Sequence, residues 1–125
     1  MARLTTHVLD TSRGAPAEGL AIELYRLETA DTPRPGATTR QLVVTAVTNA
    51  DGRTDSPLLA GDHVEVGVYE LAFRTADYFR RLGVPLTDPP FFGDVIVRIG
   101  LADPAGQYHV PLLMSPYGYT TYRGS

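Results

Sequence analysis

The chain has 125 residues, the size of one ordinary domain, and so small a domain leaves little volume for a deep cleft of its own. Its 11 basic and 14 acidic residues give a net charge of −3, which argues against a general nucleic-acid binder. All the basic residues are arginines and cysteine is absent, so lysine Schiff-base chemistry, thiolate nucleophiles and disulfides are excluded. A catalytic site in this chain would therefore be shallow or shared between subunits.

The 12 glycines and 10 prolines are spread along the whole length, so residues 1–125 are predicted to form a single domain. The N-terminus lacks the charged and then apolar profile of a secretory signal. No apolar run approaches the roughly 18 residues that a membrane helix needs. We therefore expect a cytoplasmic protein that binds neither membranes nor nucleic acids.

Apolar residues alternate with period two along most of the chain, which predicts half-buried strands. Besides a first strand around His7, the predicted strands cover residues 20–25, 42–47, 64–73, 95–99, 108–114 and 117–122. Both faces of 42–47 are apolar, which favours a strand covered on two sides. The parity of the pattern changes at Val68 and Tyr69, which predicts a bend or a break there.

Turn signals and one longer loop separate these runs, at residues 13–16, 32–39, 49–52, 60–62 and 103–106. This spacing is typical of an all-β antiparallel sandwich. A single stretch is predicted to be helical, with Thr75 as its N-cap, Asp77 in its first turn and Gly83 at its C-terminal end. Its buried side would be formed by Tyr78, Phe79 and Leu82.

The chain has three histidines, which are the natural candidates for acid–base chemistry near neutral pH. His7 lies in the first predicted strand, and His63 lies in a turn. His109 lies between Tyr108 and Val110, so it projects away from the apolar row of its strand. A single histidine in a protein strand or turn is more often a structural residue that hydrogen-bonds a neighbouring group than part of a functional site, and this holds for each of the three taken alone. A zinc site from His7 and His109 has no short ligand spacing to support it.

The end of the chain is unusual on physical grounds. Termini commonly fray, yet here a tyrosine-rich strand leads into Tyr122 and Arg123 with hardly any polar tail beyond them. Either the last strand simply finishes there, or an ordered terminus places Tyr122, Arg123 and Ser125 beside a site. Arg53 lies in the turn after residue 49, and its position alone indicates a solvated loop residue. Phosphate-binding loops, nucleophile elbows and zinc-protease motifs are absent from the sequence.

Several segments together resemble one family. They are the opening Leu4-Thr5-Thr6-His7-Val8-Leu9-Asp10-Thr11, the turn at 48–53, the pair Tyr78-Phe79, the run Tyr108-His109-Val110-Pro111-Leu112-Leu113 and the end at 118–125. In order and spacing these segments resemble the transthyretin-related proteins, and the match covers nearly the whole chain. The terminal Tyr122-Arg123-Gly124-Ser125 resembles the motif that separates 5-hydroxyisourate hydrolases from hormone-carrying transthyretins.

This resemblance implies a transthyretin-like sandwich of two four-stranded antiparallel sheets with one short helix. It also implies a homotetramer, built as a dimer of dimers, with active sites at the dimer–dimer interface. The implied activity is hydrolysis of 5-hydroxyisourate to 2-oxo-4-hydroxy-4-carboxy-5-ureidoimidazoline in urate degradation. The family's catalytic residues match His7, Arg53 and His109, and its substrate-binding motif matches Tyr122, Arg123, Gly124 and Ser125. No metal and no organic cofactor is implied, and His63 matches no site of the family.

Opening of a cyclic amide by water needs a base for the water and donors for the developing oxyanion. We hypothesise that one of His7 and His109 activates water while the other polarises or protonates the substrate, and the sequence does not assign these roles. The planar guanidinium groups of Arg53 and Arg123 suit urate-like oxygens. Gly93 replaces a proline that many relatives carry after Phe91-Phe92, outside the matched site. The rival interpretations are a non-catalytic binding protein for a small aromatic ligand and a structural sandwich without a site.

Overall fold

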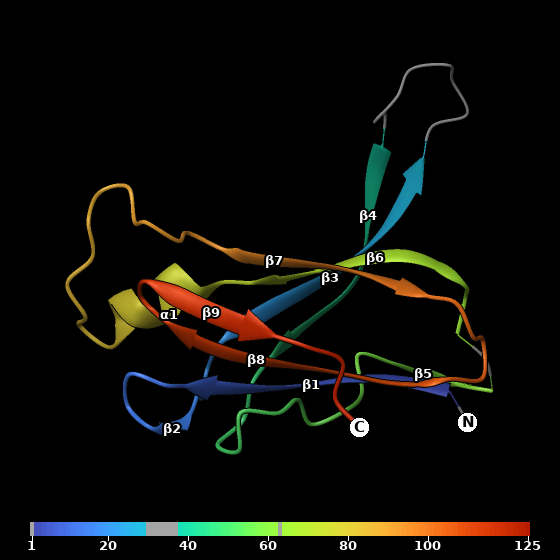
Figure 1. Ribbon diagram of the computed structural model, residues 1–125, viewed down its shortest axis with the longest axis horizontal. Coiled ribbons are helices and arrows are strands. Elements are labelled where there is room, and N and C mark those ends of the chain that lie inside the picture. Colours follow the sequence, from blue (N-terminus) through green and yellow to red (C-terminus); the bar gives the residue numbers. More distant parts are fainter. Residues whose placement is uncertain (1, 30–37, 63) are drawn as a thin grey trace.

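Two β-sheets lie face to face in the computed structural model, which describes residues 2–29, 38–62 and 64–125 (Figure 1). The elements of these residues are β1 (Ala2–Asp10), β2 (Ala15–Pro16), β3 (Ala21–Thr29), β4 (Thr38–Val47), β5 (Leu59–Gly61), β6 (Gly67–Phe73), α1 (Thr75–Arg81), β7 (Val95–Leu101), β8 (Gln107–Ser115) and β9 (Gly118–Thr121). The predicted all-β sandwich with one short helix is thereby confirmed. Among the described residues, no helix has the length and hydrophobicity of a membrane-spanning segment.

One sheet has the order β4-β3-β6-β7, and all three of its pairings are antiparallel, as predicted. The other has the order β2-β1-β8-β9, with β5 also paired to β1, so it holds five strands instead of the predicted four. The fifth strand exists because the long β1 shares one edge between two short partners, β2 at its C-terminal end and β5 at its N-terminal end.

The pairing of β1 with β8 is parallel, which corrects the expectation of purely antiparallel sheets. The period-two pattern shows which residues face the core, but it carries no information about strand direction. The first strand and the penultimate one are brought together by the long path through the other sheet, and the site described below depends on this pair.

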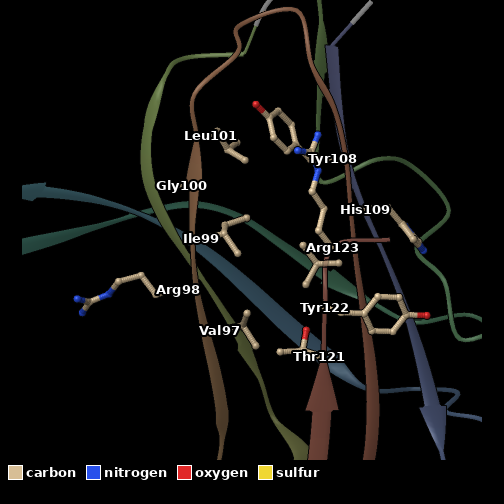
Figure 2. A pocket seen from close by; sticks show the side chains of 11 residues that line it. Val97, Arg98, Ile99, Gly100, Leu101, Tyr108, His109, Thr121, Tyr122 and Arg123 are labelled. Atoms are coloured by element: carbon tan, nitrogen blue, oxygen red, sulfur yellow. The ribbon is translucent and has the colours of Figure 1, made fainter. Parts of the chain in front are cut away.

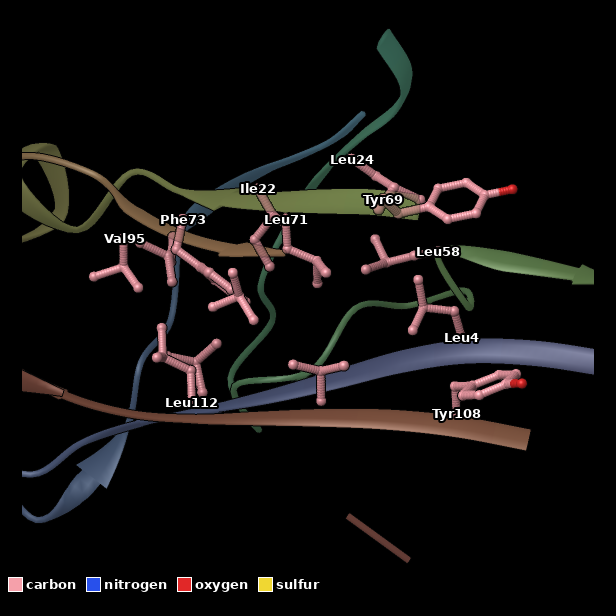
Figure 3. Close-up of a cluster of buried hydrophobic side chains, with 14 of the residues drawn as sticks. Leu4, Ile22, Leu24, Leu58, Tyr69, Leu71, Phe73, Val95, Tyr108 and Leu112 are labelled. Carbon is pink, nitrogen blue, oxygen red and sulfur yellow. The ribbon is translucent and has the colours of Figure 1, made fainter. Parts of the chain in front are cut away.

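The core lies between the two sheets and is built from the inward residues of both (Figure 3). On β1 the buried positions include Leu4, Thr6 and Val8, and on β8 they include Val110 and Leu112. Truncating a fully buried leucine such as Leu112 to alanine costs about 2–5 kcal/mol. This core fixes the register of both strands, because a slip by one residue would turn the whole inward set toward solvent.

Two details of the predicted strands are wrong. Residues 42–47 are not covered on two sides in this chain, since Leu42, Val43 and Val47 are 50%, 43% and 61% exposed on the edge strand β4. No break occurs at Val68 and Tyr69 either, because β6 starts at Gly67 and runs through both. The parity change instead reflects the end of the preceding loop. Residues 32–37 of the predicted long loop lie outside the described residues, and Thr38 and Thr39 already belong to β4.

The helix forms where the sequence predicts it, but its start and its buried side differ. Arg74 is the N-cap, and Thr75 is the first helical residue, whose buried hydroxyl donates to the Gly93 carbonyl at 3.1 Å. Tyr78 and Phe79 are buried as predicted, while Leu82 caps the C-terminus and is 40% exposed. Gly83 has a φ of 78°, which confirms the left-handed residue after the helix.

Candidate active site

The two histidines to which the family resemblance assigns catalytic roles, His7 and His109, lie on the outer face of the β1–β8 pair. Register places Thr5 opposite His109 and His7 opposite Pro111. Thr5, His7 and His109 are all half-buried and alternate with the buried residues of the core. The prediction that His109 faces away from the apolar row is confirmed. Two histidines about a hundred residues apart in sequence thus lie on neighbouring strands.

The loop that carries Arg53 is folded tightly and packed onto β1. The Asn49 side-chain oxygen accepts hydrogen bonds from the backbone N–H groups of Asp51 at 2.9 Å and Arg53 at 3.2 Å. Gly52 has a φ of 75°, and a Cβ there would lie 2.3 Å from the Val8 carbonyl oxygen. Its own carbonyl accepts from the Val8 N–H at 2.8 Å, and a β-bridge joins Arg53 to His7. Glycine is therefore needed here for Arg53 to lie beside His7.

The C-terminal residues fold back over β8. Thr121 donates from its hydroxyl to the Pro111 carbonyl at 2.8 Å, and Gly124 donates from its backbone N–H to the His109 carbonyl, also at 2.8 Å. The Arg123 guanidinium donates to the Gln107 carbonyl at 3.2 Å and lies 4.7 Å from the centre of the Tyr108 ring. Of the two interpretations left open by the sequence, these contacts favour the ordered terminus beside a site.

Two hollows flank His109. The first, of about 350 Å³, is lined by Arg3, Thr5, Arg53, Gln107, Tyr108, His109 and Ser125. The second, of about 340 Å³, lies between β7 and the β8–β9 pair, where Val97, Ile99 and Leu101 face Thr121 and Arg123 (Figure 2). Tyr122, which is 57% exposed, also lines the second hollow.

The predicted residues other than His7 and Gly124 divide between these hollows, while His7 lines neither of them and is joined to Arg53 by the β-bridge. Arg53 and Ser125 border the first, Tyr122 and Arg123 border the second, and His109 borders both. Gly124 lies against the His109 ring, where a Cβ would be only 2.6 Å from the ring carbon Cδ2.

Sequence reasoning did not single out Arg3, Thr5 or Gln107, all of which line the first hollow. The signal was available, because residues two apart on a strand share a face. Arg3 and Thr5 precede His7 at this spacing, and Gln107 precedes His109.

The surroundings of His109 favour its neutral form. Partial burial lowers the pKa of His109 below its ordinary value, and the neighbouring Arg53 guanidinium and His7 imidazole lower it further. A neutral imidazole has one nitrogen that carries a proton and one that accepts a proton. Near pH 7 the site thus offers a ring able to take a proton from water, beside a guanidinium able to hold an anionic oxygen.

In the described part of the chain, no three His, Asp or Glu side chains come together as a possible metal site. The expectation that no metal or cofactor is needed stays a prediction. His63 lies outside the described residues.

The chain belongs to the HIUase/Transthyretin family, whose profile matches residues 4–124. Within it, similar proteins include 5-hydroxyisourate hydrolase 2 of Rhizobium meliloti, 55% identical over 98% of this chain and 96% of that protein. The 5-hydroxyisourate hydrolase of Pseudomonas aeruginosa is 49% identical over 100% of this chain and 93% of its own length.

Solved structures agree with this membership. The Klebsiella pneumoniae 5-hydroxyisourate hydrolase has a TM-score of 0.76 at 32% identity, covering 98% of this chain and 99% of that chain. An (S)-allantoin synthase has a TM-score of 0.86 at 41% identity, and the match covers 99% of this chain but 44% of that longer one. Sea bream transthyretin, solved in complex with thyroxine, has a TM-score of 0.79 at 30% identity, covering 98% of this chain and 94% of that chain.

Proposed function

We propose that the chain hydrolyses 5-hydroxyisourate to 2-oxo-4-hydroxy-4-carboxy-5-ureidoimidazoline, a step of urate degradation. The observation that carries this proposal is the meeting of His109, His7 and Arg53 on the outer face of one strand pair. Relatives that align over nearly the whole chain bear the name 5-hydroxyisourate hydrolase, which supports the same substrate.

The reaction opens a cyclic amide by attack of water on a ring carbonyl. A histidine takes a proton from the water, the water oxygen bonds to the carbonyl carbon, and the carbon–nitrogen bond of the ring then breaks. The carbonyl becomes a carboxylic acid, which releases the second proton of the water to solvent as it ionises to a carboxylate. The released nitrogen receives the first proton and becomes part of the ureido group. His7 and His109 are the proposed proton-transfer groups.

The second requirement of the reaction is stabilisation of the negative charge that develops on the substrate oxygen. As the water adds, negative charge builds on the carbonyl oxygen, and a fixed guanidinium stabilises it without rearranging at that moment. We assign this role to Arg53, and its position on the same hollow as His109 supports the assignment. Arg123, Tyr122, Gly124 and Ser125 are the proposed substrate-binding residues. Gly124 lies against the His109 ring, Ser125 lines the first hollow, and Tyr122 and Arg123 line the second.

As part of the same proposal, the chain assembles into a homotetramer and acts in the cytoplasm, as predicted from the sequence. Both hollows beside His109 are formed at the surface of a small domain, so a second subunit placed over them would exclude water from the site. Excluding water strengthens every electrostatic interaction inside it.

The test is the decay of freshly made 5-hydroxyisourate, generated with urate oxidase and followed by its absorbance. We expect the purified chain to accelerate the decay far above the buffer rate. Identification of the product by carbon NMR, with a new carboxylate signal, checks the bond that breaks. A decay rate equal to that in buffer would refute the proposal and favour the rival binding protein.

A further inference from the structure

A threonine hydroxyl lies against one ring nitrogen of His109, the nitrogen Nδ1. Thr5 Oγ1 is 2.8 Å from His109 Nδ1, and the two residues are direct partners in the parallel register of β1 and β8. Thr5 is half-buried, and its β-branched side chain is restricted at χ1. The hydroxyl is therefore a rigid support for one edge of the ring, leaving Nε2 as the nitrogen available to a substrate.

The single proton of the Thr5 hydroxyl determines which tautomer of His109 this contact favours. The Thr5 hydroxyl has one proton and two acceptors in reach, the Tyr108 carbonyl oxygen at 3.4 Å and His109 Nδ1 at 2.8 Å. If it donates to Nδ1, the bond to the carbonyl is lost. If it donates to the carbonyl, it accepts a hydrogen bond from an Nδ1–H group, and both contacts are made. The second arrangement satisfies more groups at a half-buried position.

The same arrangement suits proton transfer. A ring with its proton on Nδ1 has a bare Nε2, which can accept a proton. After that transfer the imidazolium still carries Nδ1–H, so the bond to Thr5 persists and strengthens as the ring becomes charged. No hydroxyl rotation and no ring flip is required between the two protonation states.

We propose that Thr5 is a positioning residue that holds His109 in the Nδ1–H tautomer and so makes its Nε2 the base of the reaction. This inference rests on the proposed function. Of the two histidine roles that the sequence leaves open, it assigns activation of water to His109 and leaves polarisation of the substrate to His7. His109 Nε2 takes one proton from water as the water oxygen adds to the ring carbonyl, and returns that proton to the nitrogen released when the carbon–nitrogen bond breaks. Among the described residues, the charged or titratable groups around His109 are His7 on β1, Arg53 on the 49–53 loop, Arg3 and Tyr108 in the first hollow, and Arg98, Tyr122 and Arg123 in the second.

The chain offers a matched pair of threonines for the test. Thr5 and Thr6 are neighbours on β1, but Thr6 faces the core and donates to the Val110 carbonyl at 2.7 Å. Thr5→Val removes the hydroxyl while keeping the shape, Thr5→Ser keeps the hydroxyl, and Thr6→Val removes an equivalent hydroxyl away from His109.

Kinetic measurements on these variants separate positioning from a structural role. For Thr5→Val we expect kcat to fall about 10- to 100-fold, the range seen when a hydrogen-bond partner that orients a metal-bound histidine is removed, with little change in KM. Thr5→Ser should restore most of the activity. Thr6→Val should lower thermal stability and leave kcat within about twofold, since an interior hydroxyl contributes roughly 1 kcal/mol to folding and nothing to the ring. Wild-type kcat in Thr5→Val would overturn the inference.

A spectroscopic measurement tests the tautomer without relying on activity. Nitrogen-15 NMR of the wild-type chain at pH 8, with the His109 signals identified through His109→Ala, should show a protonated Nδ1 and a bare Nε2. In Thr5→Val we expect a mixture of tautomers. A wild-type ring protonated at Nε2 would overturn the inference even if the chain is active. A chain that fails to accelerate decay of 5-hydroxyisourate, yet shows the expected tautomer, would refute the proposed function and leave the Thr5 contact standing.

Discussion

Replacing Gly124 by alanine would place a methyl group where the His109 ring now lies. The added Cβ would be 2.6 Å from His109 Cδ2 and 3.1 Å from Pro111 Cγ. Carbon atoms in favourable contact lie about 3.5–4.0 Å apart, so the ring or the terminal residues must move by roughly 1 Å. Both are held in place, the ring by Thr5 at 2.8 Å and the terminus by the Gly124 N–H bond to the His109 carbonyl at 2.8 Å.

We expect Gly124→Ala to lower catalytic activity more than stability. Misplacing a reacting group by about 1 Å lowers rates by roughly 100-fold, so we expect kcat/KM of Gly124→Ala to fall by about 10- to 100-fold. Stability should hardly change, since Gly124 follows the last strand and a substitution away from the core typically alters folding by less than about 0.5 kcal/mol.

The assay is decay of freshly generated 5-hydroxyisourate, with a thermal melt of each variant. Gly118→Ala is the matched control, because the nearest atom to its added Cβ is Ser115 Oγ at 3.7 Å, an ordinary contact. We expect Gly118→Ala to keep wild-type kinetics. Equal activity of the two alanine variants would refute the argument that the terminus is packed against the catalytic ring.

Three further predictions concern the loop, the pH dependence and the assembly. Gly52→Ala should lower thermal stability and activity more than Gly14→Ala. Both glycines have a positive φ, but only a Cβ at position 52 would meet a backbone oxygen, that of Val8. Equal melting temperatures of the two variants would contradict this prediction. Because the pKa of His109 is lowered, its neutral form, the proposed base, persists to lower pH than in a free histidine. We therefore expect kcat/KM to be flat above pH 7 and to fall as the pH drops through the His109 pKa. A value of kcat/KM that keeps rising above pH 7 would contradict this assignment. Folding stability should decline in the same direction below about pH 6.5, since the unfolded chain then binds a proton that folded His109 resists. Light scattering coupled to size exclusion should give four times the chain mass, and a monomer that is fully active would contradict a site completed by a second subunit.

Local pattern was enough to predict much of the fold. Alternation along β1 and β8 separates the core-facing Val110 and Leu112 from the outward-facing His109. Gly83 is predicted at the end of the helix because a helix C-terminus favours a left-handed residue, and its φ of 78° agrees. These features depend on residues close together in the chain, and the sequence contains all the information they need.

The remaining features depend on contacts between distant segments. Nothing in the pattern of β1 indicates that it pairs in parallel with β8, so the contact of Thr5 with His109 could not be predicted. The apolar β4 was misjudged for a related reason, because its burial depends on what packs over an edge strand and not on its own composition. Only the family resemblance marks Arg53 as a catalytic residue, and its place beside His7, which no sequence pattern predicts, depends on the packing of Gly52 onto Val8.

The most direct measurement compares the decay of 5-hydroxyisourate in the presence of wild-type chain, His109→Ala and His63→Ala. Loss of a proton-transfer group costs about 10²- to 10⁴-fold, so we expect His109→Ala to fall by that factor while remaining folded. His63, the histidine that matches no site of the family, serves as the chemical control, and His63→Ala should keep wild-type activity. Wild-type activity in a folded His109→Ala variant would contradict the account.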